Sequence, residues 1–135
     1  RTQDAMAALS AWRSRHRQLE FVLVRGNHDL HAGPPPAEWQ IDEAGDCYLL
    51  PPFVCCHQPA QPGEQDDGYR LAGHLHPVVT LRERGKGALR LPCFFFGSKE
   101  ALLPAFGSFT GGYAIRPAAG DRIFAISPAG VHRVR

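Results

Sequence analysis

Four of the seven histidines in the chain follow apolar segments that have the composition of strands; they are His28, His57, His74 and His76. In open α/β sheets, ligands gather outside the carboxyl ends of the strands, so polar groups from separate segments can converge in one crevice. Neutral imidazole is the commonest metal ligand in proteins, and Asn27 and Asp29 add oxygen donors that suit harder divalent ions. We therefore predict a metal site with mixed nitrogen and oxygen ligands.

The two histidines of Gly73-His74-Leu75-His76 are separated by a single residue. In a regular strand both side chains would point to one face of the sheet, whereas Gly73 before them and Pro77 after them predict a loop. In a loop, the two imidazoles can reach two neighbouring metal ions. Each histidine taken alone could instead cap a turn or bond to a carbonyl group, but the ordered set after three strands favours metal ligation.

An amphipathic helix and a buried strand are predicted before the first of these histidines. Apolar residues recur at three- and four-residue steps over residues 3–19, and the polar residues between them are Arg13, Arg15, Arg17 and Gln18. Residues 21–24 form a short apolar run with β-branched side chains, which is typical of a strand buried on both faces. The stretch rich in glycine and proline at 33–36 ends regular structure. A helix followed by a buried strand indicates an α/β layer.

The rest of the chain has mainly strand and turn signals. Strands are predicted at residues 39–41, 48–50, 53–56, 69–72 and 78–81. Residues 81–84 and 88–91 flank Gly85-Lys86-Gly87, which predicts a hairpin because glycine permits the positive φ of tight turns. A second hairpin is predicted to join residues 122–127 to residues 131–135. The fold class is therefore α/β with a β-rich carboxyl-terminal part.

The composition is that of one globular domain. The chain has 135 residues, of which 44% are hydrophobic and 21% are charged, so it can bury a core and lacks the signature of disorder. No apolar run approaches the roughly 20 residues of a membrane span, and no signal region is visible, so we expect a cytoplasmic protein without a membrane partner. The net charge of +2 does not by itself argue for nucleic acid. Four cysteines without framework spacing favour reduced thiols.

The motifs at residues 26–29, 57 and 73–76, taken in order, resemble the last three motifs of the calcineurin-like metallophosphoesterase family. The segments at residues 91–94 and 103–112 resemble its DNA ligase-associated branch of DNA damage response endonucleases. The similarity extends from about residue 19 to residue 125. It implies that the chain is the carboxyl-terminal, β-rich part of a metallophosphoesterase-type α/β sandwich.

The resemblance also implies the chemistry and the role of each site residue. Asn27, His57 and His74 would ligate one of two divalent ions and His76 the other, with Mn expected and Fe or Zn as alternatives. His28 would lie beside the scissile phosphate, and Asp29 would orient its imidazole, as a carboxylate fixes the tautomer of a catalytic histidine. The expected reaction is metal-assisted phosphodiester hydrolysis on DNA, with a functional link to a DNA ligase and a helicase.

The sequence departs from the family pattern at its beginning. The family starts with Asp-x-His and Gly-Asp motifs, which supply further metal ligands, but Asp29-Leu30-His31 overlaps the motif at residues 26–29 and follows it in order. Gly45-Asp46 and Gly120-Asp121 match the second motif only in their letters, and we expect ordinary turns there. We expect the missing motifs to lie upstream of Arg1. Residues 1–135 would then be a single partial domain with an incomplete site and little activity of its own.

Several weaker signals each have two interpretations. Arg25 could hold a phosphate or be solvated, and Phe94-Phe95-Phe96 could stack on bases or pack in the core. Cys55-Cys56-His57 could bind metal through thiolates, although core packing is favoured. Residues 107–112 could form a phosphate-facing loop or a tight turn. The predicted hairpin carries four basic residues that could follow a nucleic-acid backbone, although a solvated edge is favoured; they are Arg82, Arg84, Lys86 and Arg90.

Two other functions remain open at this point. One is a non-catalytic module that binds metal or nucleic acid and lacks the first half of a catalytic site. The other is a phosphomonoesterase or nucleotide pyrophosphatase that uses the same metal ligands. The first would be favoured by a genuine start codon near residue 1, and the second by a preference for monoesters over diesters.

Overall fold

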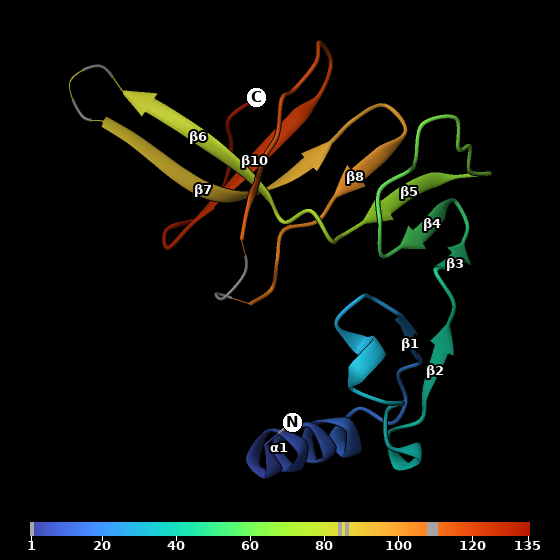
Figure 1. Cartoon of the computed structure of the whole chain (residues 1–135). Coiled ribbons are helices and arrows are strands. Elements are labelled where there is room, and N and C mark those ends of the chain that lie inside the picture. Colours follow the sequence, from blue (N-terminus) through green and yellow to red (C-terminus); the bar gives the residue numbers. More distant parts are fainter. Residues whose placement is uncertain (1, 84, 86, 108–110) are drawn as a thin grey trace. The chain divides into compact units, whose positions relative to one another are not determined.

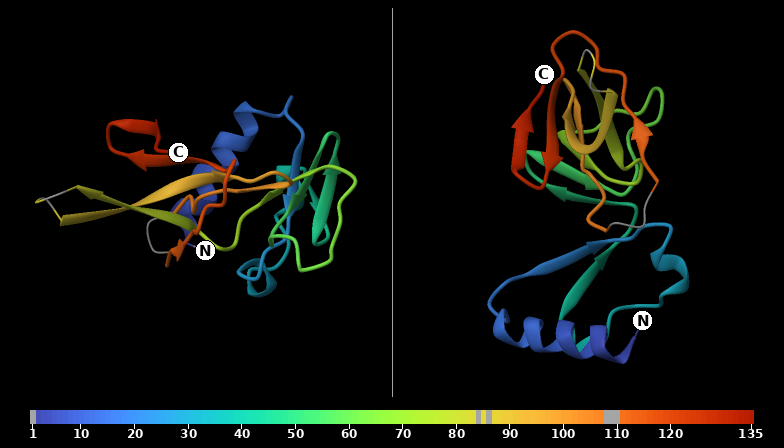
Figure 2. Two further views of the ribbon diagram at one scale, coloured as in Figure 1. Left: turned by 90° about the horizontal axis from the view of Figure 1, so that it is seen from above. Right: turned by 90° about the vertical axis from the view of Figure 1, so that its left-hand side faces the viewer.

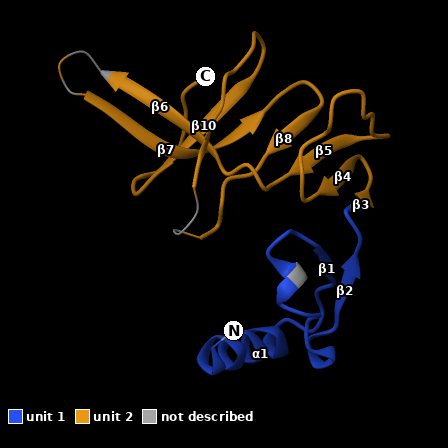
Figure 3. Cartoon of the chain, viewed as in Figure 1, with its two compact units in different colours: residues 1–47 blue, residues 48–135 orange. Residues whose placement is uncertain are grey.

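The computed structural model describes residues 2–83, 85, 87–107 and 111–135. Arg84 and Lys86 of the predicted basic hairpin, and residues 108–110 of the predicted tail motif, lie outside the described residues. The chain divides into two compact units, residues 1–47 and residues 48–135 (Figures 1 and 3). Each unit has its own secondary structure, and the predicted histidine sites are divided between them.

The first unit contains a helix and a pair of parallel strands. Helix α1 (Gln3–Arg15) begins at Thr2, whose hydroxyl accepts from the backbone N–H of Ala5 at 3.3 Å. Strands β1 (Phe21–Val24) and β2 (Ile41–Ala44) pair in parallel. Between them lie two 3₁₀ helices, η1 (Asp29–His31) and η2 (Ala37–Trp39). Within the described part of the chain, no helix is long and apolar enough to cross a membrane.

Helix α1 differs from the prediction in its end and in its buried face. It ends at Arg15, because the backbone turns at His16, whose N–H bonds to the carbonyl of Arg13. The predicted polar residue Arg13 is only 4% exposed, whereas Trp12 is 37% exposed. The Arg13 guanidinium donates to the carbonyls of Trp39, Gln40 and His16, and it lies over the ring of Phe21. The carbonyl groups at the end of η2 thus bind the Arg13 guanidinium, and these bonds determine which face of the helix is buried.

The second unit is built on one large sheet. Within the described residues it contains nine strands, of which seven follow the order β11-β10-β7-β8-β5-β4-β3, while β6 pairs with β7 and β9 with β6. The strands are β3 (Cys47–Leu50), β4 (Phe53–Cys56), β5 (Tyr69–Ala72), β6 (Pro77–Glu83), β7 (Gly87–Phe96), β8 (Glu100–Leu102), β9 (Tyr113–Ala114), β10 (Arg122–Ser127) and β11 (Gly130–Arg133). The β6–β7 hairpin extends away from the rest of this unit (Figures 1 and 2).

Most of the predicted strands and both predicted hairpins are confirmed. Strands β6 and β7 pair with Glu83 opposite Gly87, and β10 and β11 pair with Ser127 opposite Gly130. The strand predicted at residues 39–41 is wrong in its position, because Trp39 belongs to η2 and pairing with β1 begins at Ile41. The predicted strand at residues 21–24 is confirmed, although its Val22 is 37% exposed and the strand is not buried on both faces.

The two apparent Gly-Asp motifs lie between strands, as expected. Gly120 has a φ of 91°, and the Asp121 carboxylate accepts from the backbone N–H of Ala118 at 2.6 Å, which closes the turn before β10. Gly45 and Asp46 form the short connection between β2 and β3. A carboxylate bonded to its own turn has a local structural role.

The core of the second unit lies where β7, β8 and β10 meet. Ala101, Cys93, Ala125 and Ile123 are each at most 2% exposed. Burial raises the pKa of the Cys93 thiol to about 11, so this thiol stays protonated at neutral pH. Cys93 therefore behaves as a small core residue.

The prediction of four reduced cysteines is wrong for two of them. Cys47 and Cys56 are disulfide-bonded, whereas Cys55 and Cys93 are free. Strands β3 and β4 are neighbours in the sheet and are joined by only two prolines. A thiolate metal site at Cys55-Cys56-His57 does not fit this arrangement, since Cys56 is already bonded and 7% exposed.

Candidate functional site

Parallel pairing of β4 with β5 brings two of the predicted metal ligands to the same edge of the sheet. The register places Cys56 opposite Ala72, at the last position of each strand. His57 follows β4 directly, and His74 follows β5 after Gly73. The backbone N–H of Gly73 donates to the carbonyl of His57 at 3.2 Å, which extends the ladder by one bond. Both imidazoles thus begin at the carboxyl ends of adjacent parallel strands, where sheets of this kind bind ligands.

The imidazoles of His57 and His74 converge on each other. The Nε2 atom of His57 lies 3.0 Å from Nδ1 of His74, and the ring centroids are 4.8 Å apart at an interplanar angle of 73°. Two imidazole nitrogens bound to one ion at about 2.1 Å each lie roughly 3.0–3.5 Å apart. The observed separation therefore suits two ligands of one divalent ion. Both rings are half-buried, so an ion can reach them from solvent.

The loop after β5 has a strained backbone. His74 has a φ of 63° and His76 a φ of 52°, in the left-handed region that is uncommon for residues other than glycine. The loop predicted from Gly73 and Pro77 is thus confirmed. Such outliers persist only where surrounding structure holds them, and they are concentrated at functional sites. A regular strand would point both side chains to one face of the sheet, whereas in this loop the two imidazoles can take different directions.

The first unit holds the remaining predicted site residues in the turn after β1. Asn27 and His28 are exposed, and Asp29 is half-buried. The Asp29 carboxylate accepts from the backbone N–H of Gly26 at 2.8 Å, and the Asp29 N–H donates to the Gly26 carbonyl at 3.0 Å. These reciprocal bonds close the turn that presents Asn27 and His28. Asp29 therefore fixes the backbone of the turn, a function that the residue order alone did not indicate.

Arg25, the predicted phosphate ligand, already has an acidic neighbour. Its Nε lies 2.6 Å from a carboxylate oxygen of Glu43, as an ion pair without hydrogen-bond alignment. Glu43 lies opposite Leu23 in the register of β1 with β2, so the carboxylate reaches Arg25 from the adjacent strand. The two side chains are 40% and 30% exposed, and such a pair is worth little in water. A phosphate bound by Arg25 would have to compete with Glu43.

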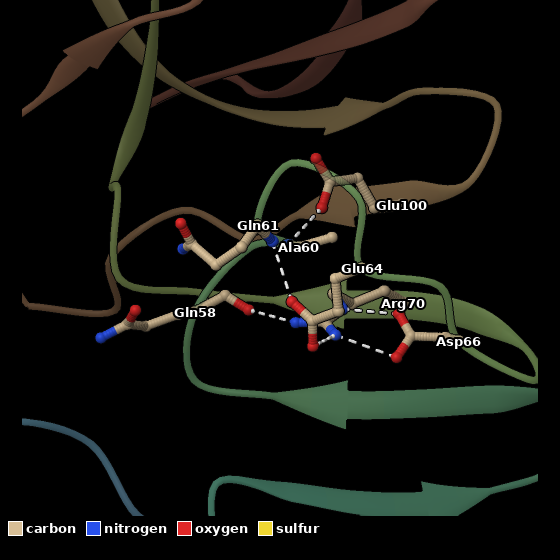
Figure 4. Close-up of polar contacts among 7 residues, drawn as sticks. All are labelled: Gln58, Ala60, Gln61, Glu64, Asp66, Arg70 and Glu100. Atoms are coloured by element: carbon tan, nitrogen blue, oxygen red, sulfur yellow. Dashed lines mark hydrogen bonds and ion pairs between the residues drawn. The ribbon is translucent and has the colours of Figure 1, made fainter.

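A second charged cluster lies at the opposite ends of the same strands. Arg70, in the second position of β5, is only 3% exposed. Its guanidinium donates to both carboxylate oxygens of Asp66, at 2.6 and 2.9 Å, to Glu64 at 2.5 Å, and to the carbonyl of Gln58 at 3.1 Å (Figure 4). These bonds anchor the loop between β4 and β5.

The charges of this cluster stabilise one another. The Arg70 guanidinium lowers the pKa of Asp66, and the pKa of Glu64 is lowered first by the Gln61 N–H and then by Arg70. The two carboxylates raise the pKa of Arg70 above its usual value. Sequence reasoning missed this cluster; a charged residue inside the apolar strand Tyr69–Ala72, shortly after three acidic residues, was the available signal.

A cavity of about 640 Å³ adjoins the Arg70 cluster. Its lining includes Tyr69, Lys99 and Glu100, at the amino ends of β5 and β8. The histidines follow the carboxyl ends of β4 and β5, so this cavity is not part of the histidine site. Of the charged groups that line it, Arg70 pairs with Glu64 and Asp66, and the Glu100 carboxylate accepts from the backbone N–H of Ala60.

The structure thus brings together two of the predicted metal ligands, His57 and His74. Within the described residues, no group of three or more His, Cys, Asp or Glu side chains is close enough to hold an ion. His76 lies in the same loop as His74, while Asn27, His28 and Asp29 belong to the first unit.

Comparison with solved structures identifies a nuclease with the same fold. The chain is similar to the crystal structure of Pseudomonas putida nuclease MPE, with a TM-score of 0.81 and 41% sequence identity. The match covers 99% of this chain and 64% of that nuclease, so the chain spans about two thirds of its length. No protein-family model and no curated protein matches the chain. The similarity at this level of identity extends to the α/β fold of both units.

The Arg70 cluster predicts a stability effect. We expect Arg70→Met to lower the free energy of unfolding by about 3 kcal/mol, because breaking a buried ion pair leaves carboxylates without a partner. The matched control is Arg116→Met, which changes an exposed arginine and should alter it by less than about 0.5 kcal/mol. Urea denaturation measures both. Equal values for the two variants would contradict the structural importance of the cluster.

The same cluster predicts a pH dependence. Folded-state pKa values below the unfolded values mean that Asp66 and Glu64 stabilise the fold above about pH 4, and that this contribution is lost as the pH falls through their folded pKa values. Wild type should therefore lose more stability than Arg70→Met between pH 5 and pH 3. Urea denaturation across this range measures the difference. Parallel curves for the two proteins would show that Arg70 does not lower these pKa values.

Proposed function

We propose that this chain forms part of a divalent-metal-dependent phosphoester hydrolase that acts as a phosphodiesterase or endonuclease on DNA. The observation that carries the proposal is the 3.0 Å approach of His57 Nε2 to His74 Nδ1 at the carboxyl ends of two parallel strands. The 41% identity to a nuclease over nearly the whole chain supports the same reaction class. The finer assignment to a metallophosphoesterase sandwich rests on the motifs at residues 26–29, 57 and 73–76. The ligase-linked repair context rests on the segments at residues 91–94 and 103–112.

In this proposal the protein holds two divalent ions through the ligands that its motifs imply. His57, His74 and Asn27 would ligate one ion, and His76 would ligate the other. A pair of such ions lowers the pKa of a bound water and neutralises the charge that gathers on a phosphoryl group during in-line displacement. A set of imidazole nitrogens and an amide oxygen accepts Mn, Fe or Zn, and we propose Mn.

The turn after β1 would act on the substrate. His28 is exposed at this turn, so its imidazole is accessible to a phosphate and can give a proton to the leaving oxygen. Asp29 closes the turn through Gly26 and so holds the backbone that carries His28. We assign His28 to proton transfer and Asp29 to the position of His28.

Arg25 would bind a phosphate on the strand side of this turn. The ion pair with Glu43 keeps the guanidinium near the end of β1 in the absence of substrate. Because the pair is partly exposed, a phosphate dianion or diester can displace the carboxylate at a small energetic cost. Arg25 thus contributes to substrate binding and leaves the metal ligands unchanged.

The first test of this function is metal binding by the histidine pair. The variant His74→Ala removes one imidazole of the converging pair. We expect it to bind Mn²⁺ at least about 100-fold more weakly than wild type, since even residues that only support metal ligands contribute 10–100-fold. Isothermal titration of the full-length protein measures the affinity. His132→Ala, which removes an exposed histidine on β11, is the control. Unchanged Mn²⁺ affinity in His74→Ala would refute the assignment of His74 as a ligand.

The second test separates catalysis from metal binding. We expect His28→Ala in the full-length protein to lower kcat by roughly 10²–10⁴-fold, the usual contribution of general acid–base catalysis, with metal content near that of wild type. Substrates are single-stranded DNA, a bis-aryl phosphodiester and an aryl phosphomonoester. Parallel loss of metal would show that His28 is a ligand. A preference for the monoester would favour a phosphomonoesterase, and no turnover of any substrate would favour a binding module.

A further inference from the structure

A short strand far along the chain is bonded to the loop that carries His74 and His76. The backbone N–H of Tyr113, the first residue of β9, donates to the carbonyl of Leu75 at 3.2 Å and to that of His76 at 3.1 Å. Strand β9 also pairs in parallel with the beginning of β6, with Tyr113 opposite Pro77. One N–H therefore engages the two carbonyls on either side of the His76 backbone.

These bonds lie where the loop is strained. Non-glycine residues with positive φ, such as His74 and His76, cost of order 1–3 kcal/mol each, and they persist only when neighbouring structure holds them. A peptide carbonyl turns with the φ and ψ angles of its neighbours. Fixing the carbonyls of Leu75 and His76 therefore restricts the two backbone positions that decide where the imidazole of His76 points.

Strand β9 is itself held in place by close packing at Gly112. A Cβ atom added at Gly112 would lie 2.5 Å from Cγ1 of Val78, a distance that real Cβ atoms essentially never show. Val78 lies in β6, opposite Ala114 of β9, so it has little freedom to move away. The absence of a side chain at Gly112 thus permits β9 to approach β6.

An arginine on β7 adds a second restraint. The guanidinium of Arg90 donates to the carbonyl of Gly112. Arg90 lies opposite Thr80 in the β6–β7 hairpin, so the bond links this hairpin to β9. Contacts from β6 and β7 therefore fix the residue immediately before Tyr113.

We propose that Gly112, Val78 and Arg90 are positioning residues that hold the histidine loop in its metal-binding conformation through the N–H of Tyr113. Its consequence for metal binding rests on the proposed function, whereas its consequence for the conformation of the loop does not. Of the two interpretations of residues 107–112, the packing at Gly112 supports a structural role for this glycine. The phosphate-facing alternative would place no requirement on Val78.

The test compares two adjacent glycines in the full-length protein. Gly112→Ala introduces the contact with Val78, whereas no atom of the described residues lies within 4 Å of a Cβ at Gly111, so Gly111→Ala is a matched control. We expect Gly112→Ala to shift the imidazole NMR resonances of His74 and His76 in the metal-free protein and to weaken Mn²⁺ binding by about 10–100-fold, as for other residues that support ligands. Gly111→Ala should match wild type in both measurements. Equal behaviour of the two variants would overturn the proposal.

A rescue variant separates positioning from general loss of stability. Val78→Ala removes both methyl groups that the new Cβ would meet, so Val78→Ala combined with Gly112→Ala should regain most of the Mn²⁺ affinity lost by Gly112→Ala. Affinity of each protein is compared with its melting temperature, and Val78→Ala alone serves as the baseline. Failure of the double variant to recover would refute the steric mechanism.

Substitutions of Arg90 test its bond to the Gly112 carbonyl without adding a Cβ atom at Gly112. Arg90→Met should weaken Mn²⁺ binding several-fold and shift the His76 resonance, while Arg90→Lys, which keeps a donor, should restore both in part. Wild-type behaviour of Arg90→Met would remove Arg90 from the proposal. If the full-length protein cleaves no phosphodiester, the proposed function fails, and the metal-free NMR comparison still decides whether β9 positions the loop.

Discussion

The parallel alignment of β4 with β5 is the constraint on which the candidate site depends. Because the two strands run in the same direction and end in register, the residues that follow them leave the sheet at one edge. This brings His57 and His74, which are seventeen positions apart, to within hydrogen-bonding distance. The loop that joins the strands must return across the sheet, and the bonds of Arg70 to Asp66, Glu64 and Gln58 hold it there. The buried arginine at the amino ends thus supports the histidine pair at the carboxyl ends.

Charge and strain are separated along these strands. At the amino ends, ionised groups satisfy one another, so the Arg70 cluster contributes to stability and has little capacity left for a ligand. At the carboxyl ends, backbone strain at His74 and His76 is held by bonds from Tyr113, and the facing imidazole nitrogens of His57 and His74 lie 3.0 Å apart. Two converging imidazole nitrogens that are held in place are suited to bind a cation. The same asymmetry explains why the cavity beside Arg70 is a poor candidate for the catalytic centre.

Strands such as β4 and β5, both hairpins and the histidine loop were predictable because local pattern determines them: apolar runs, glycine turns and Pro77 need no distant partner. Arg13 and Arg70 were not, since a buried arginine depends on carbonyls or carboxylates that the fold supplies from elsewhere. The bond of the Asp29 carboxylate to the Gly26 N–H was not predictable either, since the order of residues does not show which backbone group a carboxylate reaches. The disulfide-bonded state of Cys47 and Cys56 was not predictable, because the spacing of cysteines along the chain does not show which of them the fold oxidises. The packing of Gly112 on Val78 depends on a contact between strands far apart in the sequence.

The most direct test of the central claim is a crystal structure of the full-length protein grown with Mn²⁺, with anomalous diffraction to locate the metal. The account predicts an anomalous peak from an Mn²⁺ ion that is bound by Nε2 of His57 and Nδ1 of His74, at about 2.1–2.3 Å from each nitrogen. Direct contact between the two imidazoles, with Mn²⁺ bound at another place or absent, would contradict it.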